Sequence, residues 1–226
     1  MANIALFCEG VSENRMISYI TERYLGDGVI VNGIYPEIKE SHGQTVQAGH
    51  GGWKAVLDHC NDTDIDDALA LNDYLIIQID TDTCNQPHYD VATSEDGQPL
   101  SDEIVYERVK ERILRDISPE KRAEYEGKIL FAICFNETEC WLLPLFYENN
   151  RKQCERTHAC IFHLNSALQK VNLGLIPDTD KNSSSAIKTY DAILKRFKPK
   201  NIPKLAQYNV GFKHFVEQLD TIASTM

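Results

Sequence analysis

The sequence contains no apolar run that approaches the roughly 20 residues of a membrane-spanning helix. It has no basic stretch followed by a hydrophobic one at its N-terminus, so we expect no secretory signal. It also lacks the phosphate-binding string G-x-x-x-x-G-K-S/T, internal repeats and low-complexity linkers. These absences favour a cytoplasmic globular protein that has no membrane association and does not hydrolyse ATP through a P-loop.

Positive charge is scarce, because 23 Lys and Arg residues face 34 Asp and Glu residues, for a net charge of -11. We find no basic stripe, which argues against non-specific nucleic-acid binding by the whole surface. An enzyme that holds nucleic acid through metal ions remains compatible with this charge. The seven cysteines are an odd number with no even framework for disulfides, so we expect reduced thiols in the cytoplasm.

The 226 residues, 42% of them hydrophobic and 25% charged, have the composition of an ordinary globular protein. Short apolar runs bounded by polar turns predict buried strands at residues 3–8, 74–79 and 129–135. Residues 29–38 form a weaker fourth candidate, in which Pro36 indicates an edge strand or a strand end.

Helical spacing of apolar residues predicts helices at about 12–25, 52–60, 101–117, 137–148, 155–171, 183–196 and 209–222. Strands that alternate with helices predict an α/β fold, with a parallel sheet of about four strands flanked by helices. We expect residues 1–150 to form this α/β domain and residues 151–226 to form a helical C-terminal extension packed on it. The polar loop at 83–101 has a length that is often functional or mobile.

Acidic residues follow three of the predicted strands at the point where each strand ends. Glu9 follows the first strand, Asp80 and Asp82 follow the second, and Glu137 and Glu139 follow the third. The carboxyl ends of parallel strands gather at one edge of the sheet, where α/β proteins bind ligands. Any one of these acids by itself is also consistent with a helix cap or a turn residue.

Glu13 lies one helical turn after Glu9 and adds a further carboxylate to the set of Glu9, Asp80 and Asp82. Several carboxylates that converge without a nearby cation repel one another. A divalent cation removes this cost, and Mg²⁺ binds one or two carboxylates together with water and substrate phosphates. The sequence therefore predicts a site for Mg²⁺ or Mn²⁺. For Glu13 and Glu139 the alternative is a first-turn acid stabilised by the helix dipole.

Four stretches follow one another along the chain: LFCEGVSEN, GHGGWKAVLDHC, IIQIDTDTC and NETECWLLPLF. They resemble motifs of Toprim domains, such as those of overcoming-lysogenization-defect nucleases and of small stand-alone Toprim proteins associated with phage defence. LFCEGVSEN resembles the strand–Glu–Gly–x–Ser/Thr–Glu motif that opens the domain, and IIQIDTDTC resembles the Asp-x-Asp motif. GHGGWKAVLDHC is similar to the glycine-rich helix start between these motifs, and NETECWLLPLF is similar to a Glu-x-Glu-Ala-Trp-Leu-Leu segment. Together they cover about the first two-thirds of the chain in the family's order. Cys140 stands where the family often has alanine, and Lys188 is the best match to the family's last, basic motif.

This resemblance implies a Toprim-like Rossmannoid fold and metal-dependent hydrolysis of phosphodiesters in DNA or RNA. Glu9 and Asp80 would be catalytic, with Glu9 as general acid/base or metal ligand, and Lys188 would neutralise charge in the transition state. One or two Mg²⁺ or Mn²⁺ ions would be bound by Glu9, Glu13, Asp80, Asp82 and Glu139. The resemblance also implies an antiviral or toxic effector that acts with an ATPase or sensor partner, and a homo-oligomer is compatible with it.

Two other functions remain open. Asp80-x-Asp82 after a hydrophobic strand also resembles haloacid-dehalogenase-type phosphatases, in which the first Asp is the nucleophile. That family usually has Thr or Val four residues after the nucleophile, where this chain has Cys84. The second alternative is a non-catalytic Toprim-like subunit of a defence complex, whose acids bind only a structural ion. Because no basic stripe is present, we expect a partner to supply part of the attraction for nucleic acid.

Another group has the residue types of a zinc site: Cys154, His158, Cys160 and His163. On a single helix the first two and the last two would point in roughly opposite directions, so they could not converge on one ion. We therefore expect core and surface residues here. His42 and His50 flank a glycine-bearing loop and are expected to lie outside the site.

Overall fold

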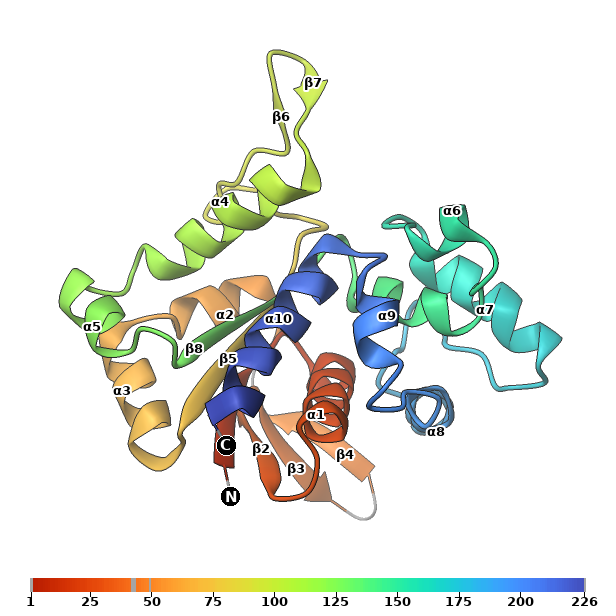
Figure 1. Ribbon diagram of the computed structural model, residues 1–226, viewed down its shortest axis with the longest axis horizontal. Coiled ribbons are helices and arrows are strands. Elements are labelled where there is room, and N and C mark those ends of the chain that lie inside the picture. Colours follow the sequence, from red (N-terminus) through yellow and green to blue (C-terminus); the bar gives the residue numbers. More distant parts are fainter. Residues whose placement is uncertain (1, 42–43, 49, 226) are drawn as a thin grey trace.

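The computed structural model describes residues 2–41, 44–48 and 50–225. At its centre is a four-stranded parallel sheet in the order β2-β1-β5-β8 (Figure 1). The strands are β1 (Ala2–Phe7), β2 (Val29–Tyr35), β5 (Tyr74–Asp80) and β8 (Ile129–Cys134). The predicted α/β class, with about four parallel strands, flanking helices and a helical C-terminal part, is confirmed.

Side chains alternate along each strand between two cores, one on each face of the sheet. In β1, Ile4 and Leu6 join the first core, whereas Ala5 and Phe7 join the second. The first core also receives side chains from α1 (Val11–Leu25), the 3₁₀ helix η1 (Thr138–Leu145), α7 (Cys160–Lys170), α8 (Ser184–Leu194), α9 (Ile202–Ala206) and α10 (Val210–Thr225). The second core receives them from α2 (Trp53–Asp58), α3 (Asp62–Leu71) and α4 (Asp102–Leu114).

The remaining elements are short and lie at the edges of this arrangement. They are α5 (Pro119–Glu124), α6 (Arg151–Cys154), the hairpin β3 (Glu37–Ser41) and β4 (Gln44–Ala48), and the hairpin β6 (Ser94–Glu95) and β7 (Gln98–Pro99). Figure 1 shows the β6–β7 hairpin standing out beyond α4. Within the described residues, no helix combines the length and the apolar character that crossing a membrane requires.

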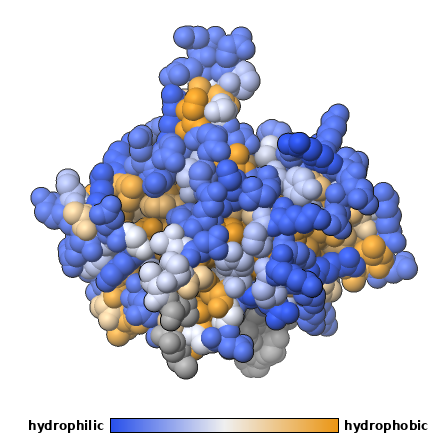
Figure 2. Space-filling model, in the orientation of Figure 1, coloured by the Kyte–Doolittle hydropathy of each residue, from blue (hydrophilic) through white to orange (hydrophobic). Residues whose placement is uncertain are grey.

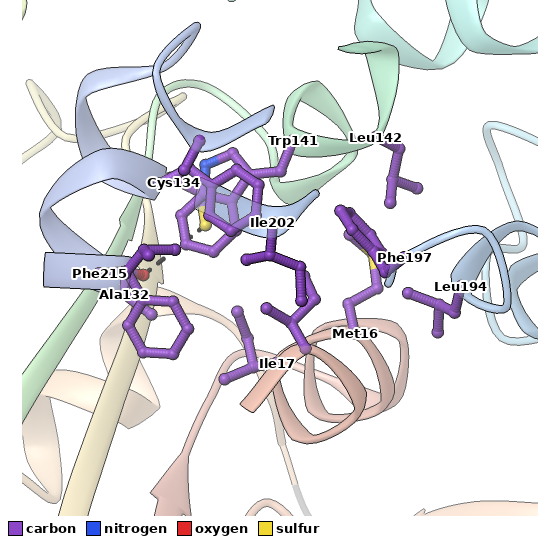
Figure 3. Packing of buried hydrophobic residues seen from close by; sticks show 14 of the residues in the cluster. Met16, Ile17, Ala132, Cys134, Trp141, Leu142, Leu194, Phe197, Ile202 and Phe215 are labelled. Atoms are coloured by element: carbon purple, nitrogen blue, oxygen red, sulfur yellow. Dashed lines mark hydrogen bonds between the residues drawn. The ribbon is translucent and has the colours of Figure 1, made fainter. Parts of the chain in front are cut away.

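The C-terminal helices share the first core with α1 and the sheet. In Figure 3, side chains from α1 (Met16, Ile17), α10 (Phe215) and the segment after α8 (Phe197, Ile202) converge on one cluster. All five are buried. The helical part therefore packs on the α/β part through a common apolar core.

Helix α10 lies in close contact with β8. A Cβ on Gly211 would lie 1.8 Å from the carbonyl oxygen of Ile133, so only glycine fits at this point of the helix. The contact also brings Phe212 against Trp141, with ring centroids 4.6 Å apart. Glycine at the start of α10 thus allows the helix to complete the first core.

Most predicted elements lie within a few residues of the observed ones, and β2 ends at Tyr35, directly before Pro36, at the edge of the sheet. The predicted helix at 137–148 is the 3₁₀ helix η1, which contains Pro144. The predicted single helix at 155–171 is wrong in its first part. Residues 155–159 separate α6 from α7, and Ala159 takes a left-handed conformation with φ 54°.

The expectation of seven reduced thiols is wrong for two of them, because Cys140 and Cys160 form a disulfide. These residues are 20 positions apart in the sequence and meet because η1 packs against α7. Cys154 lies on α6 rather than on the helix that carries Cys160 and His163. In the part of the chain that the structure describes, the four residues with zinc-ligand types form no group of converging ligands.

Candidate active site

The ends of β1 and β5 bring Glu9 and Asp80 together at the carboxyl edge of the sheet. The backbone N–H of Asp80 donates to Glu9 Oε1 (2.6 Å), and the backbone N–H of Glu9 donates to Oε1 of Gln78 (3.0 Å). The segment before α2 also touches Glu9, because the N–H of Gly52 donates to the Glu9 carbonyl (2.8 Å). A Cβ on Gly51 would lie 2.3 Å from that carbonyl oxygen, which explains why glycine precedes α2.

Asp80 is oriented by two buried polar side chains. Gln78 Nε2 (2.9 Å) and Thr138 Oγ1 (2.8 Å) both donate to Asp80 Oδ1. Gln78 and Thr138 are themselves completely shielded from solvent. Within the described residues, Oδ2 of Asp80 accepts no hydrogen bond, so this oxygen is left for a ligand.

Glu13 projects from the first turn of α1 into the same cluster. It is buried, and Ser12 Oγ donates to its Oε1 (2.9 Å) and Oε2 (3.0 Å). Its negative charge raises the pKa values of both Glu9 and Asp80, which places it within electrostatic range of the pair. Glu13 therefore lies near the pair, although among the described residues the ligand atoms of Glu9, Glu13 and Asp80 do not all come within 4.8 Å of one another.

Burial and mutual repulsion raise the pKa values of these three carboxyls, and burial is the largest cause for each. Burial, with the charges of Glu13 and Asp82, raises the pKa of Glu9 to about 8. Burial, with the charges of Glu9 and Glu13, raises the pKa of Asp80 well above its ordinary value. Burial and Glu139 raise the pKa of Glu13. The cluster therefore retains protons at neutral pH unless a cation replaces them.

Glu139 is buried and has both of its carboxylate oxygens in use. Lys181 Nζ donates to Oε2 (3.0 Å), and the hydroxyl of Tyr190 on α8 donates to Oε1 (2.5 Å). Lys181 also lies 3.6 Å from Oε2 of Glu137. Burial by itself lowers the pKa of Lys181, but the charges of Glu139 and Glu13 raise it above its ordinary value. Glu139 thus acts as a counter-ion of Lys181, and this differs from the metal ligand expected from the sequence.

Lys188 lies on an exposed part of α8. In the described part of the chain, no hydrogen bond or ion pair joins it to the acidic cluster. Lys181, seven residues earlier, contacts Glu139 and Glu137. It therefore has the position beside the acids that was expected for Lys188.

Asp82 is exposed, close enough to raise the pKa of Glu9, and it lines a recess of about 310 Å³. The walls of this recess come from the loop after β5, the start of α4 and the segment around Asn136 and His158. Asn136 Nδ2 lies 3.0 Å from His158 Nδ1, which holds the imidazole at the mouth of the recess. A larger recess of about 490 Å³ lies between α4, α10 and the first half of β8, away from the acids.

The carboxylate of Glu137 caps the N-terminus of α7. Its Oε1 accepts hydrogen bonds from the backbone N–H groups of Cys160 (2.7 Å) and Ile161 (3.2 Å) at the start of α7. A carboxylate at a helix N-terminus is stabilised by the unpaired N–H groups and the dipole. His50 is exposed, and His42 lies outside the described residues.

The donor set fits a hard divalent cation held by few protein ligands. The ligand atoms are carboxylate oxygens, and the acids outnumber the nearby cation Lys181. Among the residues that the structure describes, no donor contacts Oδ2 of Asp80. The described residues contain one group of three ligand atoms from Asp, Glu, His or Cys that lie within 4.8 Å of one another. It consists of Glu137, Cys140 and Cys160, and its two cysteines are joined in the disulfide. The acids therefore suit an ion that binds one or two carboxylates and completes its shell with water or phosphate.

Sequence reasoning misses three residues that organise the cluster: Gln78, Thr138 and Lys181. Gln78 has a detectable signal, since it is a polar residue inside the apolar run YLIIQI and must find hydrogen-bond partners when buried. Thr138 and Lys181 carry no comparable local signal, because their partners lie on other elements.

Comparison of the chain with models of known families, with curated proteins and with solved structures finds no match in any of the three. What the site can do follows from its own chemistry.

Proposed function

We propose that this chain is a Toprim-type nuclease that hydrolyses phosphodiester bonds with Mg²⁺ or Mn²⁺. The observation that carries the proposal is the contact of Glu9 with Asp80 at the ends of neighbouring parallel strands. Glu13 and Asp82 add negative charge around this pair, and Lys181 supplies a positive charge beside Glu13. Acids of this kind at the carboxyl edge of a parallel sheet suit the binding of a metal and of a phosphate.

Glu9, Glu13, Asp80 and Asp82 would hold the metal ion, which when bound would stabilise the attacking and leaving oxygens of the phosphodiester. The side chains of the protein perform the remaining tasks. Burial raises the pKa of Glu9 to about 8 in the metal-free protein, which makes this carboxyl the candidate for the general acid/base. Gln78 and Thr138 orient Asp80, and Glu139 holds Lys181 in place as a source of positive charge for the phosphate.

The wider role is proposed from the resemblance to Toprim proteins. The chain would be an antiviral or toxic effector in the cytoplasm, and an ATPase or sensor partner would control it. It would act on DNA or RNA and could form a homo-oligomer. The absence of a P-loop string from the sequence supports a separate partner as the source of any ATPase activity.

The test is a titration of the protein with Mg²⁺ and Mn²⁺, following thermal stability and the cleavage of plasmid, single-stranded DNA and RNA. We expect the wild type to bind metal and to cut, and Asp80→Ala/Asp82→Ala to lose both. The chain offers a matched control, since Asp178→Ala/Asp180→Ala removes the acids of an identical Asp-Thr-Asp tripeptide in an exposed turn. This control should behave as the wild type. Metal binding without cutting would favour the non-catalytic subunit, and no metal response in the wild type would overturn the proposal.

A second experiment separates the two lysines. Lys181→Gln should reduce the cleavage rate roughly 10²-fold or more, the usual effect of losing a charge that stabilises a transition state. Lys188→Gln should leave the single-turnover rate with saturating protein unchanged, because Lys188 has no contact with the acids. Removing Lys181 also leaves Glu139 without its cation, so the melting temperature must be recorded for both variants. Equal losses in the two variants would contradict the assignment of Lys181.

A further inference from the structure

The segment that contains α8 and α9 is basic, in a chain whose net charge is -11. Six of the 23 Lys and Arg residues fall between positions 188 and 204, where the one acid is Asp191. Asp191 is paired with Arg15 of α1 (2.9 Å), so its charge is already compensated. Of the six cations, Lys204 pairs with Glu148. The other five, all exposed, form what we call the α8–α9 basic surface: Lys188, Lys195, Arg196, Lys198 and Lys200. The expectation that the chain has no basic stripe does not hold for this segment.

These cations are not neutralised by neighbouring acids. In the described part of the chain, Lys188, Lys195, Lys198 and Lys200 form no ion pair, and the guanidinium of Arg196 lies over the ring of Phe146 (4.7 Å). Lys198 Nζ donates only to the carbonyl oxygen of Lys195 (3.1 Å). Elsewhere, several cations have acidic partners, as in Arg108 with Glu95 and Arg112 with Asp116. The five cations between positions 188 and 200 therefore form a local excess of positive charge in an acidic chain.

The α8–α9 basic surface begins beside the acidic cluster. Helix α8 starts three residues after Lys181, and Tyr190 within it donates to Glu139. Lys188 and Lys195 are two helical turns apart on one side of α8, roughly 10 Å along its axis. Figure 1 shows α8 and α9 next to α1, the helix that carries Glu13. Helix α8 therefore starts near the acids, and exposed cations follow along it to the turn before α9.

We infer that the α8–α9 basic surface binds the phosphate backbone of the nucleic-acid strand whose phosphodiester enters the acidic cluster. This inference rests on the proposed nuclease function and names the surface that would attract the substrate. Exposed cations without acidic partners release counterions when they contact phosphates, which is the main source of non-specific affinity.

The composition of the segment favours nucleic acid over a lipid surface. Membrane-surface helices need large apolar side chains beside their cations. The large hydrophobic side chains that are exposed in the described chain lie elsewhere, and none falls between residues 188 and 204. Figure 2 likewise shows mainly hydrophilic atoms over α8 and α9 on the face that it presents.

The test measures binding in EDTA, so that cleavage does not interfere, with labelled single-stranded and duplex oligonucleotides at about 50 to 200 mM salt. The variant is Lys195→Gln/Lys198→Gln/Lys200→Gln, which leaves Arg196 stacked on Phe146. We expect a roughly 10- to 100-fold loss of affinity and a salt slope of log K smaller by about 2. The matched control, Arg23→Gln/Arg115→Gln/Lys128→Gln, removes the same charge from exposed positions on other elements and should bind as the wild type.

Several results would overturn the inference. They are equal losses in the variant and the control, no binding by the wild type at 50 mM salt, and tighter lysine-dependent binding to phosphatidylserine vesicles than to the oligonucleotides. The nuclease proposal fails separately. Binding that depends on the three lysines, in a protein that never cuts with Mg²⁺ or Mn²⁺, would retain the surface and reject the nuclease. Cutting by the triple-lysine variant, with unchanged affinity and salt slope, would reject the surface and retain the nuclease.

Discussion

At the scale of single residues, the acidic cluster concentrates negative charge where little water can solvate it. The carboxylate of Glu9 accepts a hydrogen bond from the backbone of Asp80, and the buried Glu13 lies within electrostatic range of both. Such an arrangement costs folding free energy when the carboxyls are ionised, and proteins accept such a cost mainly at functional sites. The cost also has a direct experimental consequence, because protons and metal ions compete for the same oxygens.

We predict a specific pH dependence of stability in metal-free buffer. The pKa of Glu9 is raised from 4.5 to about 8, with burial as the first cause, so the folded state binds a proton that the unfolded state releases. The stabilisation from this proton is complete below about pH 4.5 and is lost as the pH rises through 8. Melting temperatures with EDTA across this range should therefore fall more steeply for the wild type than for Glu9→Gln. The exposed-acid variant Glu111→Gln should follow the wild type, and parallel curves for Glu9→Gln and wild type would contradict the prediction.

At the scale of elements, the contacts between η1 and α7 help to hold the site residues in position. Glu137 caps α7, Glu139 on η1 holds Lys181, and the Cys140–Cys160 disulfide joins the two helices. Both sulfurs are completely buried. The position of Lys181 therefore depends on how η1 and α7 are held together.

We predict that a reductant destabilises the wild type. A disulfide that closes a loop of 20 residues stabilises by about 3 kcal/mol in the chain-entropy account. Urea unfolding should give a lower midpoint for the wild type in dithiothreitol than without it. Cys140→Ala/Cys160→Ala serves as the internal control, because its midpoint should be the same with and without reductant. An unchanged wild-type midpoint would show that the bond does not contribute.

At the scale of the whole molecule, the α/β part and the helical part are one folding unit. The first core includes residues from β1, β5 and β8 together with residues from α7 to α10. Trp141, which lies before the expected division at residue 150, stacks on Phe212, which lies after it. The division of the sequence at residue 150 therefore does not correspond to a division of the core.

We predict that a fragment of residues 1–150 does not fold by itself. Helix α10 alone contributes buried Phe212, Phe215, Leu219 and Ile222, each worth about 1.5–3 kcal/mol of burial. Their loss is comparable with the whole stability of a typical domain, about 5–15 kcal/mol. Near-ultraviolet circular dichroism of Trp141 should show a fixed environment in the full chain and none in the fragment. A cooperative unfolding transition in the fragment would contradict this prediction.

The sequence by itself determined the strands and the acids at their ends. Local patterns suffice for this, because a short apolar run followed by a turn predicts a buried strand wherever it lies in the fold. The run ending at Asp80 and the run ending at Phe7 therefore predict the sheet and the meeting of Asp80 with Glu9. The polar residue Gln78 inside such a run carried a further local signal.

Only the tertiary structure decided which lysine meets the acids, where the helix at 155–171 is interrupted, and which cysteines pair. Glu139 contacts Lys181, 42 residues away, and Tyr190, 51 residues away. Contacts over such distances are set by how helices pack against the sheet, and the spacing of residues along one segment contains no record of that packing. For the same reason, the role proposed for the basic residues from Lys188 onward depends on the packing of α8 against α1, which the local sequence does not reveal.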